Sequence, residues 1–147
     1  MGNQMGNQRF ITREQASFTE LLEHQESIIL DLENLHYYSL NAAATLLWKH
    51  LRSGSANSSL ELSANLASAF GISLEKAELD TRSFIAELLQ NQLITPTDEK
   101  VTGPSVFTMP APGELPAYES PAVKTSNAVM EMNLASGSST ASTGALG

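Results

Sequence analysis

All six prolines of this 147-residue chain lie after Thr95, and their position confines where regular structure can form. Proline lacks a backbone N–H and fixes φ, so closely spaced prolines interrupt helices and central strands. The sequence therefore predicts three regions. Residues 1–14 form a disordered N-terminus, residues 15–95 form the folded domain, and residues 96–147 form a tail that is Pro-rich and then Ser/Thr/Gly-rich.

The stretch 26–41 predicts a β-hairpin that leads into a helix. Residues 26–32 alternate with the two-residue period of a half-buried strand, with Ile28, Leu30 and Leu32 on one face. Residues 33–36 supply the turn, and residues 37–40 pair back as the second strand. Residues 18–24 fit a strand or a helical turn, and a strand is favoured because a lone hairpin is marginally stable.

Three helices are expected next, over residues 42–52, from the Ser58 capping box to Phe70, and 74–91. Asn41 and Ser73 have side chains suited to cap the first and third helices. The expected fold is therefore α+β and winged helix-turn-helix-like. A small antiparallel three-stranded sheet precedes three helices, with a disordered C-terminal tail.

Composition restricts the partners and the chemistry. The formal net charge is -8, and an acidic surface repels phosphate backbones and anionic lipid. The chain has no cysteine, no secretory signal and no apolar run of about 20 residues that could span a bilayer, which fits a cytoplasmic protein.

Catalytic motifs are absent from the sequence. It contains no glycine-rich phosphate loop and no nucleophile elbow, and the histidines His24, His36 and His50 fall on different predicted elements. We therefore expect no catalytic residue, no metal, no cofactor and no enzyme activity.

A hairpin with three helices leaves two binding functions open. In a winged helix the third helix would enter the major groove of DNA, but here it carries two basic against four acidic side chains. Peptide binding fits better, because the strand Tyr37–Leu40 presents backbone donors and acceptors on a free edge where an extended peptide can add.

Residues 29–51, ILDLENLHYYSLNAAATLLWKHL, and residues 78–94, ELDTRSFIAELLQNQLI, resemble the PqqD family. This family comprises the peptide chaperone of pyrroloquinoline quinone biosynthesis, and its fold recurs as the recognition element of ribosomally synthesised, modified peptides. The resemblance covers about residues 20 to 95. Trp48 and the Asp80-x-x-x-Phe84 spacing belong to it, whereas Leu35 stands where the family often has a turn glycine.

The resemblance implies a non-catalytic chaperone that binds the leader of a precursor peptide by β-strand addition. It would deliver the peptide to a modifying enzyme such as a radical SAM enzyme, a cyclase or a protease. Carried over by position, the strand edge and one face of the third helix would bind the peptide, with contacts from Tyr37, Tyr38, Ser39, Leu40, Lys76, Asp80, Ser83 and Glu87.

A second resemblance lies in the tail, within a leader-like segment at residues 118–134. Tyr118-x-x-Pro121-x-Val123 is similar to the Tyr-x-x-Pro-x-Leu segment in leaders of lasso-peptide precursors. We hypothesise that the chain carries this segment in cis, as a fused substrate or as a strand that occupies its own site. The 22 residues from Pro96 to Ala117 would reach about 26 Å as a flexible coil. An ordinary disordered tail is the alternative.

Two other functions remain open for the whole chain. One is a winged-helix DNA-binding regulator. The other is a non-catalytic subunit that binds only its partner biosynthetic enzyme.

Overall fold

The fold is described here from a computed structural model, which places residues 8–23, 25–54, 56–98, 110 and 113–127. In chain order the strands and helices are β1 (Arg9–Thr12), β2 (Ala16–Leu22), β3 (Glu26–Asp31), β4 (His36–Leu40), α1 (Ala42–Ser53), α2 (Ser59–Phe70), α3 (Leu74–Gln90), β5 (Ile94–Thr97) and β6 (Val123–Asn127).

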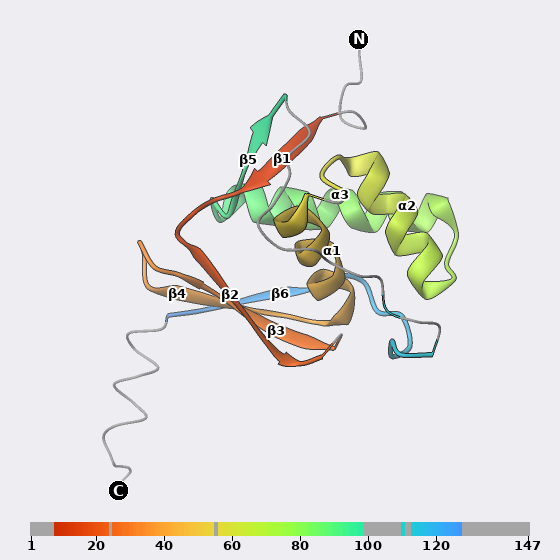
Figure 1. Ribbon diagram of the computed structural model, residues 1–147, viewed down its shortest axis with the longest axis horizontal. Helices are drawn as coiled ribbons and strands as arrows, with labels where there is room; N and C mark the ends of the chain where they lie inside the picture. The colour runs from red at the N-terminus through yellow and green to blue at the C-terminus, as the bar shows by residue number, and fades with distance from the viewer. Residues whose placement is uncertain (1–7, 24, 55, 99–109, 111–112, 128–147) are drawn as a thin grey trace, which may run out of the picture.

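The main sheet has the order β2-β3-β4-β6, and each neighbouring pair of strands is antiparallel. A separate two-stranded sheet pairs β1 with β5. Helix α1 lies beside the main sheet, and α2 and α3 pack against each other beyond it (Figure 1). The predicted α+β fold, with three consecutive antiparallel strands followed by three helices, is confirmed. The structure adds a fourth strand to the sheet from the tail.

The three predicted helix starts are confirmed by their caps. The side chains of Asn41, Ser58 and Ser73 each accept a hydrogen bond from the backbone amide three residues further on. This satisfies a donor that the helix itself leaves unpaired. Gly54 and Gly71 end α1 and α2 in the left-handed conformation, with φ of 82° and 68°.

Strand β3 buries the face opposite to the one that its apolar residues suggest. Ile28 and Leu30 are only half-buried and Leu32 is 57% exposed, whereas Ser27, Ile29 and Asp31 are buried. The buried polar groups have partners, since the Ser27 and Thr45 hydroxyls lie 2.7 Å apart. A hydrogen-bonded polar residue can therefore occupy the core face at little cost.

Strand β1 lies inside the segment expected to be disordered. Phe10 is 2% exposed in the core, and its amide donates to the carbonyl of Asn57 at 2.8 Å. Its partner strand β5 contains Pro96, which is tolerated because β5 pairs on one side only. The folded part therefore begins before residue 15 and extends past residue 95, while residues 1–7 lie outside the described part of the chain.

The β3–β4 turn is held by Asp31, whose carboxylate accepts hydrogen bonds from the amides of Glu33 and Asn34 at 2.9 and 3.1 Å. Leu35 follows with φ of 59°, in the left-handed region that side chains with a Cβ rarely adopt. Its side chain is 42% exposed, so its packing offsets little of this strain.

We therefore expect Leu35→Gly to stabilise the protein by about 0.5–1 kcal/mol, because glycine adopts this φ without strain. Urea unfolding of the two proteins measures the difference. Leu32→Gly is the matched control, since Leu32 is an exposed leucine in the same turn without a positive φ. The expectation is wrong if the glycine at position 35 gains no more stability than the glycine at position 32.

Candidate functional site

The outer edge of β4 is occupied by the tail strand β6. The two strands are antiparallel, and their register pairs His36 with Asn127 and Leu40 with Val123. The strand edge predicted from Tyr37–Leu40 is therefore in place, and it pairs with an extended segment that includes Val123. We call β4, Asn41 and Asp80 together the β4 site, and residues 118–127 the tail segment.

The side chains of β4 divide between two faces of the sheet. Tyr38 and Leu40 are 2% and 1% exposed and belong to the core, whereas Tyr37 and Ser39 are half-buried on the opposite face. Val123 faces the core beside Leu40 and packs against it from the rim. The edge therefore meets the tail segment through its backbone, which suits recognition by strand addition.

Asp80 on α3 receives two hydroxyl groups of the tail segment on one carboxylate oxygen. The Tyr118 hydroxyl donates to Oδ2 at 2.5 Å, and the Ser120 hydroxyl donates to the same oxygen at 3.0 Å. Lys76, one helical turn earlier, places its ammonium group 3.2 Å from Oδ2. Hydrogen bonds to an ionised carboxylate are among the stronger ones in proteins.

These contacts set the protonation states of the two partners. Partial burial raises the pKa of Asp80. The hydrogen bonds from Tyr118, Lys76 and Ser120 together lower this pKa by more than burial raises it, so the net pKa lies below 3.8. Burial and then the hydrogen bond to Asp80 raise the pKa of the Tyr118 hydroxyl well above 10.0. Around neutral pH the pair is therefore a carboxylate with a protonated phenol.

The other residues expected on the wall of α3 contribute less to the contacts seen here. Lys76 touches the carboxylate rather than the tail. Among the described residues, neither Ser83 nor Glu87 makes a side-chain hydrogen bond to the tail segment, although both lie on the same helix as Asp80. Pro121 is half-buried and directly follows Ser120, which contacts both Asp80 and Asn41.

Asn41 was expected only to cap α1, yet it also contacts the tail backbone. Its Nδ2 donates to the carbonyl of Ser120 at 2.8 Å, and its Oδ1 accepts from the amide of Ala122 at 3.1 Å. Oδ1 also accepts from the amide of Ala44, as a helix cap does. The signal available in the sequence was its position between a strand edge and a helix start, where a side-chain amide reaches both.

Phe70, at the end of α2, is a second residue that sequence reasoning did not assign to this site. Its ring packs edge-on against the ring of Tyr118, with centroids 5.1 Å apart and planes at 65°. Such a pair adds stabilisation beyond the area that it buries. Phe70 and Asp80 lie on different helices. Only the packing of α2 on α3 brings both side chains to Tyr118.

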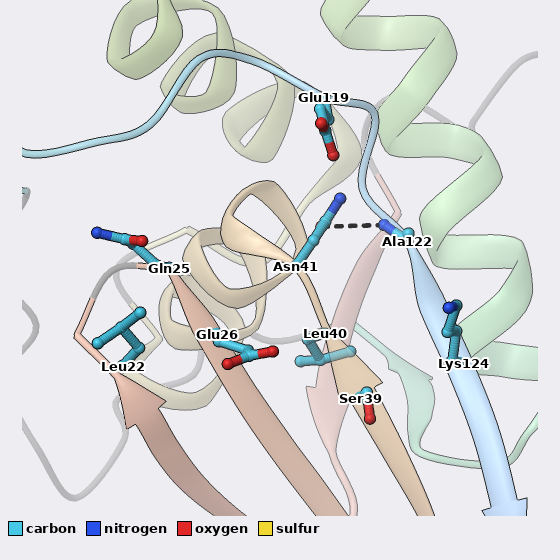
Figure 2. A pocket seen from close by; sticks show the side chains of 9 residues that line it. All are labelled: Leu22, Gln25, Glu26, Ser39, Leu40, Asn41, Glu119, Ala122 and Lys124. Atoms are coloured by element: carbon cyan, nitrogen blue, oxygen red, sulfur yellow. Dashed lines mark hydrogen bonds between the residues drawn. The ribbon is translucent and has the colours of Figure 1, made fainter.

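A cavity of about 500 Å³ opens beside the docked tail segment, where the β2–β3 turn, the end of β4 and the tail meet (Figure 2). It is lined by Leu22, Gln25, Glu26, Ser39, Leu40, Asn41, Glu119, Ala122 and Lys124. Three of these residues belong to the tail segment, so the tail forms one wall of the cavity.

The described residues contain no cluster of three His, Asp or Glu side chains that could hold a metal ion. Within the same residues, no helix is long and apolar enough to cross a membrane.

One known protein family matches the sequence of this domain. The sequence model of PqqD, described as coenzyme PQQ synthesis protein D, matches residues 26–94. This part of the chain belongs to the PqqD family. The match begins at β3 and ends at the first residue of β5, so it includes β4, Asn41 and Asp80 but not the tail segment.

A solved structure shares the fold of this PqqD-family domain. It is described as TbiB1 in complex with the TbiA(beta) leader peptide, and it is 19% identical in sequence with a TM-score of 0.52. The match covers 57% of this chain and 93% of TbiB1. No curated protein matches the chain.

Proposed function

We propose that this PqqD-family domain is a recognition element that binds the leader of a ribosomally made precursor peptide by strand addition at the β4 site. It presents the bound peptide to a modifying enzyme, such as a radical SAM enzyme, a cyclase or a protease, and is itself non-catalytic. The observation that carries this proposal is the pairing of an extended segment with the outer edge of β4. Its membership of the PqqD family and the fold that it shares with leader-bound TbiB1 support the proposal.

In this proposal the backbone of β4 supplies affinity and the surrounding side chains supply specificity. Asp80 selects for hydroxyl groups and Asn41 holds the peptide backbone where it enters the strand. The same roles apply to the tail segment, in which Tyr118, Pro121 and Val123 occupy the positions of a leader motif. The tail segment then acts as a fused leader that occupies the site of its own chain.

Binding of DNA is disfavoured by the same geometry. Helix α3 carries Glu75, Glu78, Asp80 and Glu87 against Lys76 and Arg82, and Asp80 with its paired Lys76 faces the tail segment. An acidic helix repels a phosphate backbone. The proposal is therefore restricted to peptide ligands.

The function can be tested with a chain that ends at Asp98 and a synthetic peptide of residues 114–127. We expect titration followed by NMR to shift the backbone amides of residues 36–41 and of Asp80, because the peptide would replace the missing tail. A peptide with Thr125→Pro is the matched control, since proline removes an N–H and distorts an added strand.

Amide dispersion of the shortened chain is checked first, so that loss of fold is not read as loss of binding. The proposal fails if the folded, shortened chain shows no shifts along β4 at millimolar peptide. It also fails if the control peptide with Thr125→Pro produces the same shifts as the unmodified peptide.

A further inference from the structure

The β4 site is occupied by a part of the same chain that makes contacts along its whole length. The tail segment pairs with β4 over five residues, from Val123 to Asn127. Ahead of that strand, Ser120 and Ala122 are held by Asn41, and Tyr118 is held by Asp80 and Phe70. A second peptide cannot use this edge of β4 while the tail segment is docked there.

Polar atoms of the site are largely satisfied by the tail segment. The Asn41 side chain uses its amide as a donor and its carbonyl as an acceptor, and the Asn41 backbone N–H points at the carbonyl of Ala122 at 3.4 Å. One oxygen of Asp80, whose side chain is 13% exposed, accepts both tail hydroxyls. Removing the tail without a replacement would leave these partly buried groups to water or unpaired, which is unfavourable.

We propose that the β4 site is self-ligated, so that a peptide from another molecule binds only by exchange with residues 118–127 of this chain. The inference rests on the proposed function and adds the regulation of the site and the class of ligand. A successful competitor needs an aromatic hydroxyl residue and a second hydroxyl residue two positions later, both for Asp80, followed by an extended strand.

Exchange sets a threshold for binding in trans. If the tail has effective concentration C and dissociation constant Kt, a peptide with dissociation constant Kp shows an apparent Kd of Kp(1 + C/Kt). For a peptide identical to the tail, Kp equals Kt and the apparent Kd cannot fall below C. Short flexible linkers give C of roughly millimolar. A peptide that binds this protein tightly must therefore make stronger contacts than the tail segment does.

The test compares full-length chains that differ only in the tail. The release variant carries Tyr118→Ala and Ser120→Ala, which remove both hydroxyl groups from Asp80 and leave the β4 site unchanged. The control variant carries Glu119→Ala, at an exposed residue between them. The probe is a fluorescent peptide of residues 114–127, and the readout is its apparent Kd by anisotropy.

We expect the wild-type and control chains to bind the probe with an apparent Kd of about 1 mM or weaker. The release variant should bind it at least tenfold more tightly, because its tail competes less well. A probe with Tyr118→Phe should bind the release variant about tenfold more weakly than the unmodified probe, since it lacks the hydroxyl for Asp80.

The other outcomes would each contradict either the proposed self-ligation in cis or the proposed function. Equal and tight binding by the wild-type chain and the release variant would mean that the tail does not gate the site, and the proposed function would stand. Absence of binding to every chain, with no NMR shift along β4, would refute the proposed function itself. A chain that sediments as a dimer, and as a monomer after the release substitutions, would show exchange of tails between copies rather than ligation in cis.

Discussion

Asp80→Ala in the full-length chain is expected to undock the tail segment from β4 while the PqqD-family domain stays folded. The substitution removes the acceptor of the Tyr118 and Ser120 hydroxyls together. Loss of hydrogen bonds to a charged group corresponds to about 3 kcal/mol. That change multiplies the undocked population roughly a hundredfold.

Hydrogen exchange of the amides in β4 and β6 measures this effect directly, because docking protects the amides that form hydrogen bonds between the two strands. Exchange in α1, where Trp48 and Leu47 are buried in the core, reports on the fold. Protection should fall along β4 and β6 and remain in α1.

Glu87→Ala is the matched control, since it removes the same charge from the same helix. Among the described residues, the Glu87 side chain makes no hydrogen bond to the tail segment. Unchanged protection of β4 and β6 in Asp80→Ala would contradict the assigned role of Asp80. Equal loss in both variants would indicate an effect of helix charge rather than of the two hydroxyl contacts.

The free energy of unfolding is expected to fall by about 3 kcal/mol as the pH is lowered from 6.5 to 4, because of His50. Its imidazole is 3% exposed in α1, and burial lowers its pKa to about 4. In the unfolded chain the imidazole takes up a proton near pH 6.5, whereas in the folded chain it does so only near pH 4. The unfolded state is therefore favoured progressively as the pH falls between these values, and the loss is complete below pH 4.

Urea unfolding at several pH values checks this, with His50→Gln as the variant that cannot titrate. The slope of stability between pH 6.5 and 4 should be lost in His50→Gln, whatever its absolute stability. Asp31 and Asp80 act in a different window, since their lowered pKa values contribute stability that is lost only as the pH falls below about 3.8. A slope that persists unchanged in His50→Gln would contradict the assignment.

Local chemistry determines much of this fold, so it could be predicted from the sequence. The caps at Asn41, Ser58 and Ser73 each act through an amide three residues away. The buried stripe of α3, including Thr81, Phe84 and Leu88, follows helical periodicity. Alternation also predicts the strand Tyr37–Leu40, which lies within β4. The tail motif around Tyr118, in contrast, comes from a resemblance to a leader and not from local chemistry.

Long-range packing determines the remainder. Nothing local indicates that Phe10 joins the core, because its partners Asn57 and Pro96 lie far along the chain. The inverted face of β3 depends on Thr45 of α1, which satisfies Ser27. Likewise, Phe70 and Asn41 reach the tail segment only because α2 packs on α3 and the tail returns to β4. Residues 128–134 of the expected leader-like segment lie outside the described part of the chain.

Because β6 is antiparallel to β4, the tail segment runs along the site in one defined chain direction. The tail segment enters beside Asn41 and leaves at Asn127, which is paired with His36 at the end of the β3–β4 turn. Under the proposed function, a modifying enzyme that acts on a peptide beyond its docked strand would therefore approach the sheet at this turn rather than beside the start of α1. Leu32 and Leu35, which are 57% and 42% exposed, lie in that turn and would be open to contact with the enzyme.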